Sequence, residues 1–592
     1  MLLVASATGL HADDKRPWKG YSILGNGHLT VVYSDDTRIA ALTHATGIQH
    51  FYFNDYTADY IASTSFEPVG QGASSAAVLG MKNFFTAESR MPLATVLCFV
   101  HPNDAAVVSL RSSSSARYRF TARLRGGAVQ VKGRIALAHW PTGTVIAIAP
   151  KSPDAQVSAN GSNVIVTGVD TGAEVLIVPA GSEAEVLAKV QALRREPDLE
   201  ASAKAYWEAW MNAGRLPAFG REDPESAKYL EAYKRNLYCV KAANLNGQIP
   251  ADITGQFVTN NMPQLYPRDA MMCARVLLAT GHGEDARQVI EFWANRRIPM
   301  KTPGEWYARY DAHAKAVDAG TGARYDEPEW DSNGYYIYLL SEYHRQTGVW
   351  LANREFWFAL ADFLVGHIDP NGLLYEGGIV EWTGYLPATN MICAAALKTA
   401  STMARELGDT HRAEAYAAAS QKISSALPEM FDRTRQTYAD VRFTGKKGVH
   451  GESLGSRAGE KTYLWDTTAN VGVIWGYPNR RELELSNSFY RKNTVKLGGG
   501  MQYFDSPDPG LASYGHDVFF FTTAAASQFE SLYGSKSLAK GYLDWMIQNA
   551  NSYGLMPERI HLDDSDCSPA SPLSWCSAEF AAALLLWSQG AM

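Results

Sequence analysis

The stretch "SEAEVLAKVQALRRE", residues 182–196, divides the sequence into two regions of different composition. Apolar residues recur in it at helical spacing, and Ala, Leu and Glu replace the Val, Thr and Ser of the preceding region. The chain has 592 residues, more than a single hydrophobic core usually organises. We therefore expect two or more structural units, with a domain boundary at about residues 195–225.

The region before this stretch is predicted to form β-strands. Short runs rich in β-branched and aromatic residues are separated there by gaps rich in Gly, Ser, Asn and Asp. The runs lie at residues 25–34, 94–102, 105–113, 116–124, 144–150 and 163–169. Such regular spacing is typical of an antiparallel β-sandwich.

The region after the boundary alternates helical segments with long loops. The segments lie at residues 225–245, 268–280, 284–295, 333–347, 354–366, 388–407, 411–426, 516–533, 537–550 and 574–589. Two all-α architectures suit this pattern, a solenoid of repeats and a closed toroid of six inner and six outer helices. We find no motif repeated at a fixed period, which favours the toroid.

Composition narrows the class of partner. Hydrophobic residues make up 46% of the chain and charged residues 19%, and the net charge is -7, which gives no basic patch for nucleic acid or anionic membrane. No apolar run approaches the roughly 20 residues of a membrane-spanning helix. The 15 Trp and 30 Tyr residues are suggestive of platforms for sugar rings.

The opening "MLLVASATGLHADD" resembles the end of a signal peptide but lacks a basic segment, and it could equally be a first strand, so the compartment stays open. The sequence gives no oligomeric state.

The six cysteines are scattered, without the spacing of a zinc site. Only Cys567 and Cys576 are close enough to make a local disulfide worth testing. We expect no cofactor.

The motif "QLYPRDAMMCARVLLATG", residues 264–281, places Arg268 and Asp269 in the first turn of a helix, because Pro267 keeps the chain before it extended. Asp269 could simply favour the helix dipole. Alternatively, an Arg–Asp pair facing a cavity supplies adjacent donors and acceptors, which is what recognition of vicinal sugar hydroxyls requires.

The motif "DEPEWDSNGYYIYLLSEYH", residues 326–344, places Trp330 and Asp331 at the mouth of the next helix. Asp331 could cap that helix or bind substrate. Packing alone explains Trp330 less well, because the tryptophan lies in a polar loop.

The motif "DPNGLLYEGGIVEWTGYLPATN", residues 369–390, holds Glu376 and Glu381 among aromatic residues, with Trp382 directly after the second glutamate. A carboxyl group against aromatic rings is partly desolvated, which raises its pKa and keeps it protonated near neutral pH. That is the requirement for a general acid.

The motif "NSYGLMPERIHLDDSDCSPASPLSWCSAEF", residues 551–580, places Glu558 in a loop before a helix whose first turn contains Trp575. The acidic residues between them could form a solvated loop or a structural calcium site, and we favour the solvated loop. These are Asp563, Asp564 and Asp566.

The four motifs each precede a helix, so they could converge on one mouth of a helical toroid. Two carboxyl groups in one aromatic pocket are the minimum apparatus for glycoside hydrolysis, one protonating the leaving oxygen and the other activating water. The order of "YPRDA", a Trp–Asp loop, a Glu–Trp loop and "GLMPE" followed by "PLSW" resembles the glucoamylase-type glycoside hydrolases, family 15 and its close relatives.

This resemblance implies an N-terminal β-sandwich (residues 1–195), a helical linker (196–225) and an (α/α)6 barrel (226–592). It also implies an inverting, exo-acting hydrolase that releases a sugar, by default glucose, from the non-reducing end of α-glucosides or oligosaccharides.

The resemblance assigns roles to individual residues. Arg268 and Asp269 would hold hydroxyls of the terminal sugar, Glu558 would be the general base and Glu381 the general acid. The remaining substrate-binding candidates are Trp330, Asp331, Trp382 and Trp575. The sequence departs from the family at the acid, which usually follows a Trp or Tyr, whereas here Trp382 comes after Glu381. Glu376 therefore remains an alternative acid.

Two other functions stay open at this point. The first is a disaccharide phosphorylase of the same helical-toroid group. Its "GNG" element resembles Gly25, Asn26 and Gly27 in this sequence. Glu558 argues against it, because a phosphorylase uses phosphate as nucleophile and does not need a second carboxylate. The second is a non-catalytic carbohydrate-binding protein.

Overall fold

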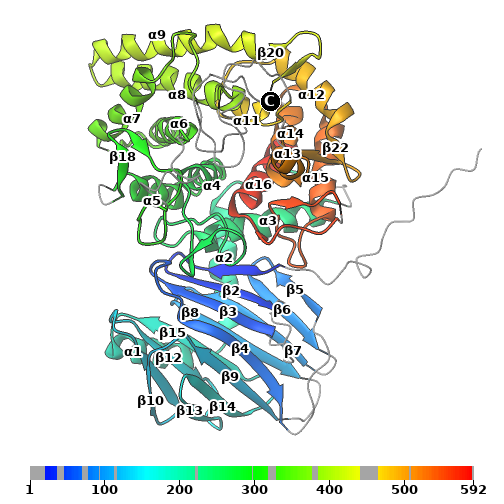
Figure 1. The fold of residues 1–592 in the computed structure, drawn as a ribbon. Coiled ribbons are helices and arrows are strands. Elements are labelled where there is room, and N and C mark those ends of the chain that lie inside the picture. The colour runs from blue at the N-terminus through cyan, green and yellow to red at the C-terminus, as the bar shows by residue number, and fades with distance from the viewer. Residues whose placement is uncertain are drawn as a thin grey trace, which may run out of the picture.

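The computed structural model consists of a β-sheet region below a helical region, joined by an upright helix (Figure 1). It describes residues 20–35, 46–69, 78–91, 94–112, 117–219, 225–295, 298–317, 329–351, 353–375, 384–439, 465–505, 509–563 and 565–589.

The described residues of the β-sheet region form three antiparallel sheets. Their strand orders are β1-β2-β3, β10-β11-β12-β15-β8-β7-β6-β5 and β13-β14-β9-β4. The strands are β1 (Ser22–Gly25), β2 (Leu29–Asp35), β3 (Thr46–Phe53), β4 (Ile61–Pro68), β5 (Val78–Asn83), β6 (Thr86–Met91), β7 (Ala94–His101), β8 (Ala105–Ser112), β9 (Tyr118–Leu124), β10 (Ala128–Lys132), β11 (Ile135–His139), β12 (Val145–Pro150), β13 (Gln156–Asn160), β14 (Asn163–Val169) and β15 (Glu174–Ala180). The six predicted runs coincide with β2, β7, β8, β9, β12 and β14, and the other strands of these sheets were not predicted.

Burial along these strands follows the pleat. Along β9 every second side chain is buried, so one face of its sheet packs on the core. β12 is buried at every position, as expected for a central strand covered on both faces.

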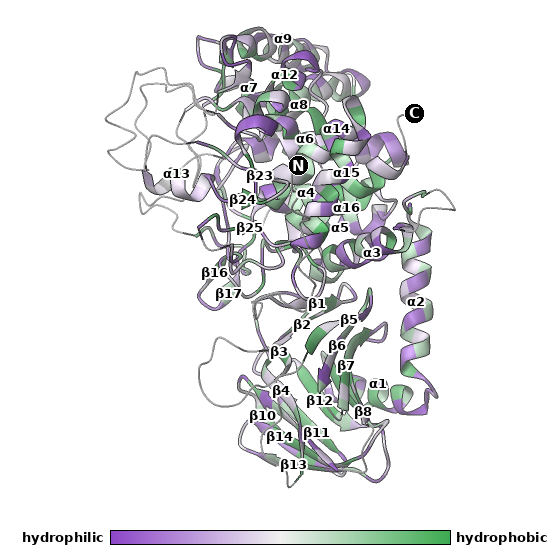
Figure 2. Ribbon diagram, turned by 90° about the vertical axis from the view of Figure 1, so that its right-hand side faces the viewer, coloured by the Kyte–Doolittle hydropathy of each residue, from purple (hydrophilic) through white to green (hydrophobic). Residues whose placement is uncertain are grey.

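Two helices connect the regions. Ser182 caps the N-terminus of α1 (Glu183–Arg195) and Asp198 caps α2 (Leu199–Ala213), each by accepting a backbone N–H bond in the first turn. The buried Trp207 of α2 donates its indole N–H to the carbonyl of Val100 at 3.1 Å, which anchors the helix on the sandwich. Figure 2 shows α2 running from the sandwich toward the helical region.

The helical region is built from helix pairs. Its helices are α3 (Ser226–Ala243), α4 (Pro267–Ala279), α5 (Gly283–Trp293), α6 (Asp331–Thr347), α7 (Arg354–Gly366), α8 (Pro387–Glu406), α9 (Thr410–Ala426), the 3-10 turn η3 (Leu427–Met430), α11 (Ala469–Ile474), α12 (Arg481–Asn493), α13 (Pro509–Gly515), α14 (Phe520–Tyr533), α15 (Lys536–Gln548) and α16 (Ser574–Gln589).

Within the described residues, six of these helices form a closed inner ring. Each contacts the next in the order α4, α6, α8, α11, α14, α16, and α16 contacts α4 again. The outer helices α5, α7, α9, α15 and α3 pack on α4, α6, α8, α14 and α16. Asn470 of α11 and Asn487 of α12 exchange side-chain hydrogen bonds of 2.9 and 2.7 Å, which attaches the sixth outer helix. This arrangement is a toroid, not a solenoid.

The inner helices are buried on nearly all sides, as expected for helices that are apolar all round. Glycines allow two of them to approach α8 closely. A Cβ atom on Gly334 of α6 would lie 2.8 Å from Ile392, and one on Gly472 of α11 would lie 2.6 Å from the Cβ of Met391.

We expect Gly472→Ala to destabilise the protein by about 1–3 kcal/mol, because the nearest atom to the added methyl group is the Cβ of Met391, which is fixed to the backbone and cannot swing away. The matched control is Gly541→Ala in the outer helix α15, where a Cβ would meet nothing within 4 Å. Alanine should stabilise the helix there by about 0.5–1 kcal/mol. Thermal unfolding midpoints of the two variants should therefore move in opposite directions. Equal shifts would contradict the close α8–α11 packing.

The sandwich also contacts the barrel directly. The hydroxyls of Thr30 and Tyr56 donate to the carbonyls of Ala242 and Ala243 at 2.8 and 2.7 Å, which satisfies the last carbonyls of α3. The side chain of Asn26 accepts the backbone N–H groups of the two residues that complete the β1–β2 turn, at 2.9 and 3.0 Å. The "GNG" element is thus a structural hairpin turn at the domain junction.

The predicted helices are observed to within a few residues, but the sequence does not predict α11, α12 or α13. Nor does it predict ten short strands: β16 (Val258–Thr259), β17 (Met262–Pro263), β18 (Met300–Thr302), β19 (Glu305–Trp306), β20 (Phe431–Asp432), β21 (Thr437–Tyr438), β22 (Val495–Lys496), β23 (Gly500–Gln502), β24 (Val518–Phe519) and β25 (Arg559–Ile560). Strands of two or three residues leave no periodic signal. The suggested disulfide is not formed, since all six cysteines are free and buried.

Candidate active site

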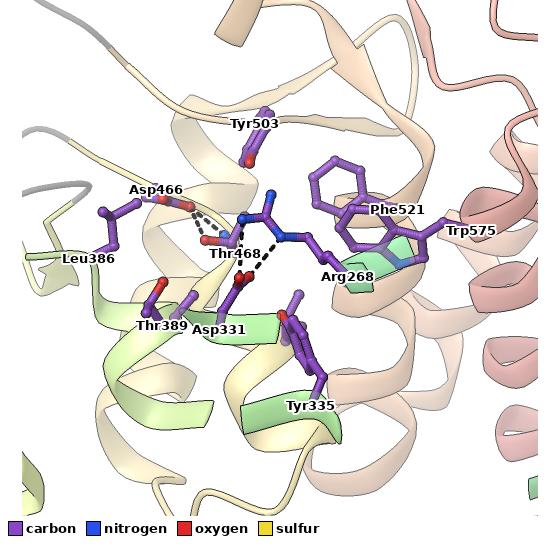
Figure 3. A pocket seen from close by; sticks show the side chains of 12 residues that line it. Arg268, Asp331, Tyr335, Leu386, Thr389, Asp466, Thr468, Tyr503, Phe521 and Trp575 are labelled. Atoms are coloured by element: carbon purple, nitrogen blue, oxygen red, sulfur yellow. Dashed lines mark hydrogen bonds and ion pairs between the residues drawn. The ribbon is translucent and has the colours of Figure 1, made fainter. Parts of the chain in front are cut away.

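A pocket of about 450 Å³, a volume that includes its open mouth, lies at the N-terminal ends of the inner helices. Every helix of the inner ring contributes a lining residue from its first turns or the residues just before it. The lining residues are Arg268, Asp331, Tyr335, Leu386, Ala388, Thr389, Asp466, Thr468, Val471, Tyr503, Phe521 and Trp575. Three of the predicted site residues, Arg268, Asp331 and Trp575, are therefore brought together (Figure 3).

The central polar feature of the pocket is an ion pair between Arg268 and Asp331. The Nε of Arg268 donates to Oδ2 of Asp331 at 2.7 Å and its Nη2 donates to Oδ1 at 3.2 Å. Glu329 adds a second acidic contact at 3.5 Å. Asp331 is the first residue of α6, and no side chain caps that helix, so the carboxylate orients the guanidinium instead. Such a two-point contact fixes the plane of the arginine before any ligand binds.

Aromatic side chains form much of the wall. The rings of Phe521 and Trp575 stack at a centroid distance of 4.4 Å. Tyr503 meets Phe521 edge-on at 4.9 Å, and Tyr335 packs against Trp475 at 4.6 Å. Aromatic walls around a few oriented polar groups are typical of small-molecule sites.

Asp466 is a pocket carboxylate that the sequence analysis did not identify. It is buried, and its Oδ1 accepts hydrogen bonds from the backbone N–H of Thr468 at 2.6 Å and from the Thr468 hydroxyl at 2.5 Å (Figure 3). The signal was present in the sequence, because "LWDTTAN" places a Trp–Asp pair just before α11, and "EWDSNG" places a similar pair at the start of α6. Tyr503 had no such signal, since its position depends on the pairing of β23 with β24.

Asp269 is buried beside the pocket but does not line it. Burial raises its pKa to about 7, with further increases from the charges of Glu558 and Asp331, while Arg268 opposes the shift. The arginine next to it forms an ion pair with Asp331 that joins two helices, and of the two predicted residues Arg268 lines the pocket.

We expect Asp269→Asn to gain stability relative to the wild type as the pH rises. An aspartate in the unfolded chain has a pKa near about 3.9, whereas the folded value is about 7. At pH values between these two pKa values, Asp269 is protonated in the folded protein and ionised in the unfolded chain. The contribution of Asp269 to the stability of the wild type is thus complete below about pH 4 and is lost as the pH rises through about 7. Each pKa unit corresponds to about 1.4 kcal/mol, so the change is on the order of a few kcal/mol.

Thermal unfolding of both proteins between about pH 4 and 8 tests this difference. The matched control is Asp409→Asn, because Asp409 caps α9 from the surface and its pKa is lowered by the backbone N–H of Arg412. Its difference from the wild type should stay flat over this range. A flat profile for Asp269→Asn as well would contradict the raised pKa.

Glu558 is 5% exposed and lies directly before β25. Its Oε1 accepts a hydrogen bond from the hydroxyl of Tyr514 at 3.1 Å, and its Oε2 accepts one from Arg559. Burial raises the pKa of Glu558, and both of these contacts oppose the rise by favouring the carboxylate. Its backbone carbonyl accepts the N–H of Phe520, the residue before the pocket-lining Phe521. Glu558 is thus held next to the pocket wall and does not line it.

Arg559 is fixed by several groups besides Glu558. Its Nε donates to Asp517 at 3.0 Å, and its Nη1 donates to the side chain of Gln256 at 3.4 Å. Asp517 also contacts Nδ1 of His561 at 2.9 Å. This network holds a permanent positive charge beside the Glu558 carboxylate.

Among the remaining predicted site residues, Trp330 is described and does not line the pocket. Trp330 is buried, donates its indole N–H to Glu305 at 3.1 Å and packs edge-on against Phe363 and Tyr375. The predicted acid Glu381, its alternative Glu376 and the predicted binding residue Trp382 lie outside the described residues. Leu386, a few residues after them, does line the pocket.

No group of three or more His, Cys, Asp or Glu side chains among the described residues is arranged to hold a metal ion. Asp563 and Asp566 belong to that part of the chain, whereas Asp564 does not. The helices of the described part include none long and apolar enough to cross a membrane.

Neither a protein-family model nor a curated protein matches the sequence. Solved structures do match. A bacterial glucoamylase complexed with acarbose superposes with a TM-score of 0.70 at 13% identity, covering 97% of this chain and 94% of that one. A glucoamylase from Saccharomycopsis fibuligera covers 64% of this chain and 99% of its own, with a TM-score of 0.49 at 13% identity.

The match to the bacterial glucoamylase spans both regions, so the chain has the fold of that protein. The predicted architecture, an antiparallel β-sandwich followed by an (α/α)6 barrel, is confirmed. The resemblance to glucoamylase-type proteins is confirmed at the level of the fold.

Proposed function

We propose that the protein is a glycoside hydrolase that removes a sugar, by default glucose, from the non-reducing end of α-glucosides or oligosaccharides with inversion. The observation that carries this proposal is the pocket at the N-terminal ends of the inner helices, where an oriented Arg268–Asp331 pair lies among four aromatic rings. The shared fold with a glucoamylase that binds acarbose supports it.

The pocket offers groups suited to a sugar ring. Hydroxyl groups need both donors and acceptors, which a guanidinium and nearby carboxylates supply together. Arg268 and Asp331 form one such set, and Asp466 with Thr468 forms a second. Because these groups are held by bonds to each other, little further ordering is needed when substrate binds. The rings of Trp575 and Phe521 provide apolar surface for the faces of the sugar.

Glu558 is proposed as the general base and Glu381 as the general acid, with Glu376 as the alternative acid. A base that activates water must be ionised, and Arg559 and Tyr514 favour the ionised form of Glu558 against the effect of burial. An inverting mechanism requires the two carboxyl groups to stand roughly 6.5–9.5 Å apart, which leaves room for the attacking water.

The "GNG" element forms the turn of the β1–β2 hairpin, so its presence does not favour the phosphorylase alternative. Phosphate dependence nevertheless separates the two reactions directly.

An NMR time course on a panel of glucose disaccharides, with and without inorganic phosphate, tests the proposal. We expect release of free sugar without phosphate, with the opposite anomeric configuration to the bond cleaved. Product formation that requires phosphate would identify a phosphorylase. Binding of the sugars without turnover on any linkage would identify a carbohydrate-binding protein.

A further inference from the structure

One residue of the sandwich side, Tyr21, binds three loops of the barrel. It lies directly before β1 and is buried. Its backbone N–H donates to the carbonyl of Ser571 at 3.1 Å, and its own carbonyl accepts from Nδ2 of Asn551 at 3.3 Å. Its hydroxyl accepts the N–H of Ile253 at 2.9 Å and donates to the carbonyl of Pro572 at 3.4 Å. All the hydrogen-bonding groups of this tyrosine therefore contact the barrel.

Two of these loops flank Glu558 in the chain. Asn551, which holds the carbonyl of Tyr21, folds the turn 551–555 by accepting the N–H groups of Tyr553 and Leu555, each at 3.0 Å. After this turn the backbone N–H of Glu558 donates to the carbonyl of Ala570 at 2.9 Å, next to the Ser571 that Tyr21 binds. The chain on both sides of the glutamate is thus attached to Tyr21.

The third loop reaches the carboxylate of Glu558 from another direction. Asp252, the neighbour of Ile253, accepts the N–H groups of Gln256 and Phe257 at 2.7 and 3.3 Å, which closes the loop 252–257. The side chain of Gln256 then accepts a hydrogen bond from Arg559 at 3.4 Å, and Arg559 pairs with Glu558. By binding the loop 252–257, the Tyr21 hydroxyl therefore helps to hold Arg559 in place, and Arg559 favours the ionised form of Glu558.

We propose that Tyr21 is a positioning residue through which the N-terminal sandwich holds the loops around Glu558 in their working arrangement. The part that concerns catalysis rests on the proposed function, since it takes Glu558 as the general base. In this arrangement the sandwich is a component of the active site, although its strands contribute no residue to the pocket lining.

Tyr21→Phe tests the proposal, because it removes only the hydroxyl and leaves the buried N–H of Ile253 without its acceptor. The matched control is Tyr60→Phe. Tyr60 is also buried, but its hydroxyl bonds to Thr144 within the sandwich at 2.9 Å. Both variants lose one hydrogen-bonded hydroxyl of a buried tyrosine, so Tyr60→Phe measures the general effect of such a loss.

Hydrogen exchange of the full chain needs no substrate and tests the structural part. We expect faster exchange in residues 251–257 and 551–573 for Tyr21→Phe but not for Tyr60→Phe. Unchanged exchange in these segments, or equal changes in both variants, would overturn the proposal. Loss of the proposed function alone would leave this result intact.

Activity tests the catalytic part. On a substrate that the wild type hydrolyses, Tyr21→Phe should lower kcat by about tenfold or more, because small displacements of a catalytic group are costly. KM should stay within about twofold, since the pocket-lining residues are untouched. A kcat equal to that of Tyr60→Phe would overturn this part.

A second variant tests separately the connection from the loop 252–257 to Glu558 through Arg559. Gln256→Leu removes the contact to Arg559 without changing the sandwich. The acidic limb of kcat/KM, which reports the pKa of the base, should move to higher pH as Arg559 loosens. The groups whose charges or bonds act on Glu558 include Arg559, Tyr514, Ser568, Asp252, Asp269 and Cys576. If the acidic limb of kcat/KM for Gln256→Leu stays at the pH of the wild type, Gln256 does not connect the loop 252–257 to Glu558.

Discussion

Glu558→Gln is expected to lower kcat by about 10²–10⁴-fold, the range that a positioned general base contributes. Glutamine keeps the shape of the side chain, and its single amide oxygen can still accept a hydrogen bond from Arg559, while its NH2 group can donate to the Tyr514 hydroxyl, but it cannot take a proton from water. Binding of a sugar ligand should therefore be largely retained. Steady-state kinetics together with calorimetric binding separates the two effects. Unchanged turnover would remove Glu558 as the base.

Glu530→Gln is the matched control for this prediction. Glu530 is buried at 4% exposure and pairs with Arg491 at 2.6 Å, as Glu558 pairs with Arg559. It lies near the C-terminal end of α14, whereas the pocket residue Phe521 lies at the N-terminal end. Neutralising it should reduce stability, because Arg491 loses its partner, and should leave kcat close to that of the wild type. A similar loss of kcat in both variants would indicate a general structural effect.

Glu381→Gln is expected to reduce hydrolysis of a natural disaccharide by about 10²–10⁴-fold and to recover much of the rate on a substrate with an activated leaving group. A good leaving group departs without protonation, so it bypasses the missing acid. The matched variant is Glu376→Gln, only five residues away, which should remain within a few-fold of the wild type on both substrates. If the leaving-group rescue belongs to Glu376→Gln, the acid is Glu376.

The sequence by itself predicted the long helices and six of the strands in the β-sheet region. The period of apolar residues predicted the long helices, because a buried stripe at 3.6-residue spacing is a property of the segment alone. The helix α11, six residues long, carries too few turns to show a period and was missed. Residues in the first turn of a helix, such as Arg268 and Trp575, could be placed for the same local reason. The boundary at about 195–225 remains a prediction from the change in composition.

Only the tertiary structure decided which of these residues meet. Arg268 pairs with Asp331, 63 residues away, because the ring of inner helices brings the two N-termini together. Tyr503 reaches the pocket through a short β-ladder, and Tyr21 reaches the loops around Glu558 across more than 500 residues of sequence. Such contacts depend on how elements pack, and packing is set by many residues at once, so no local pattern encodes them.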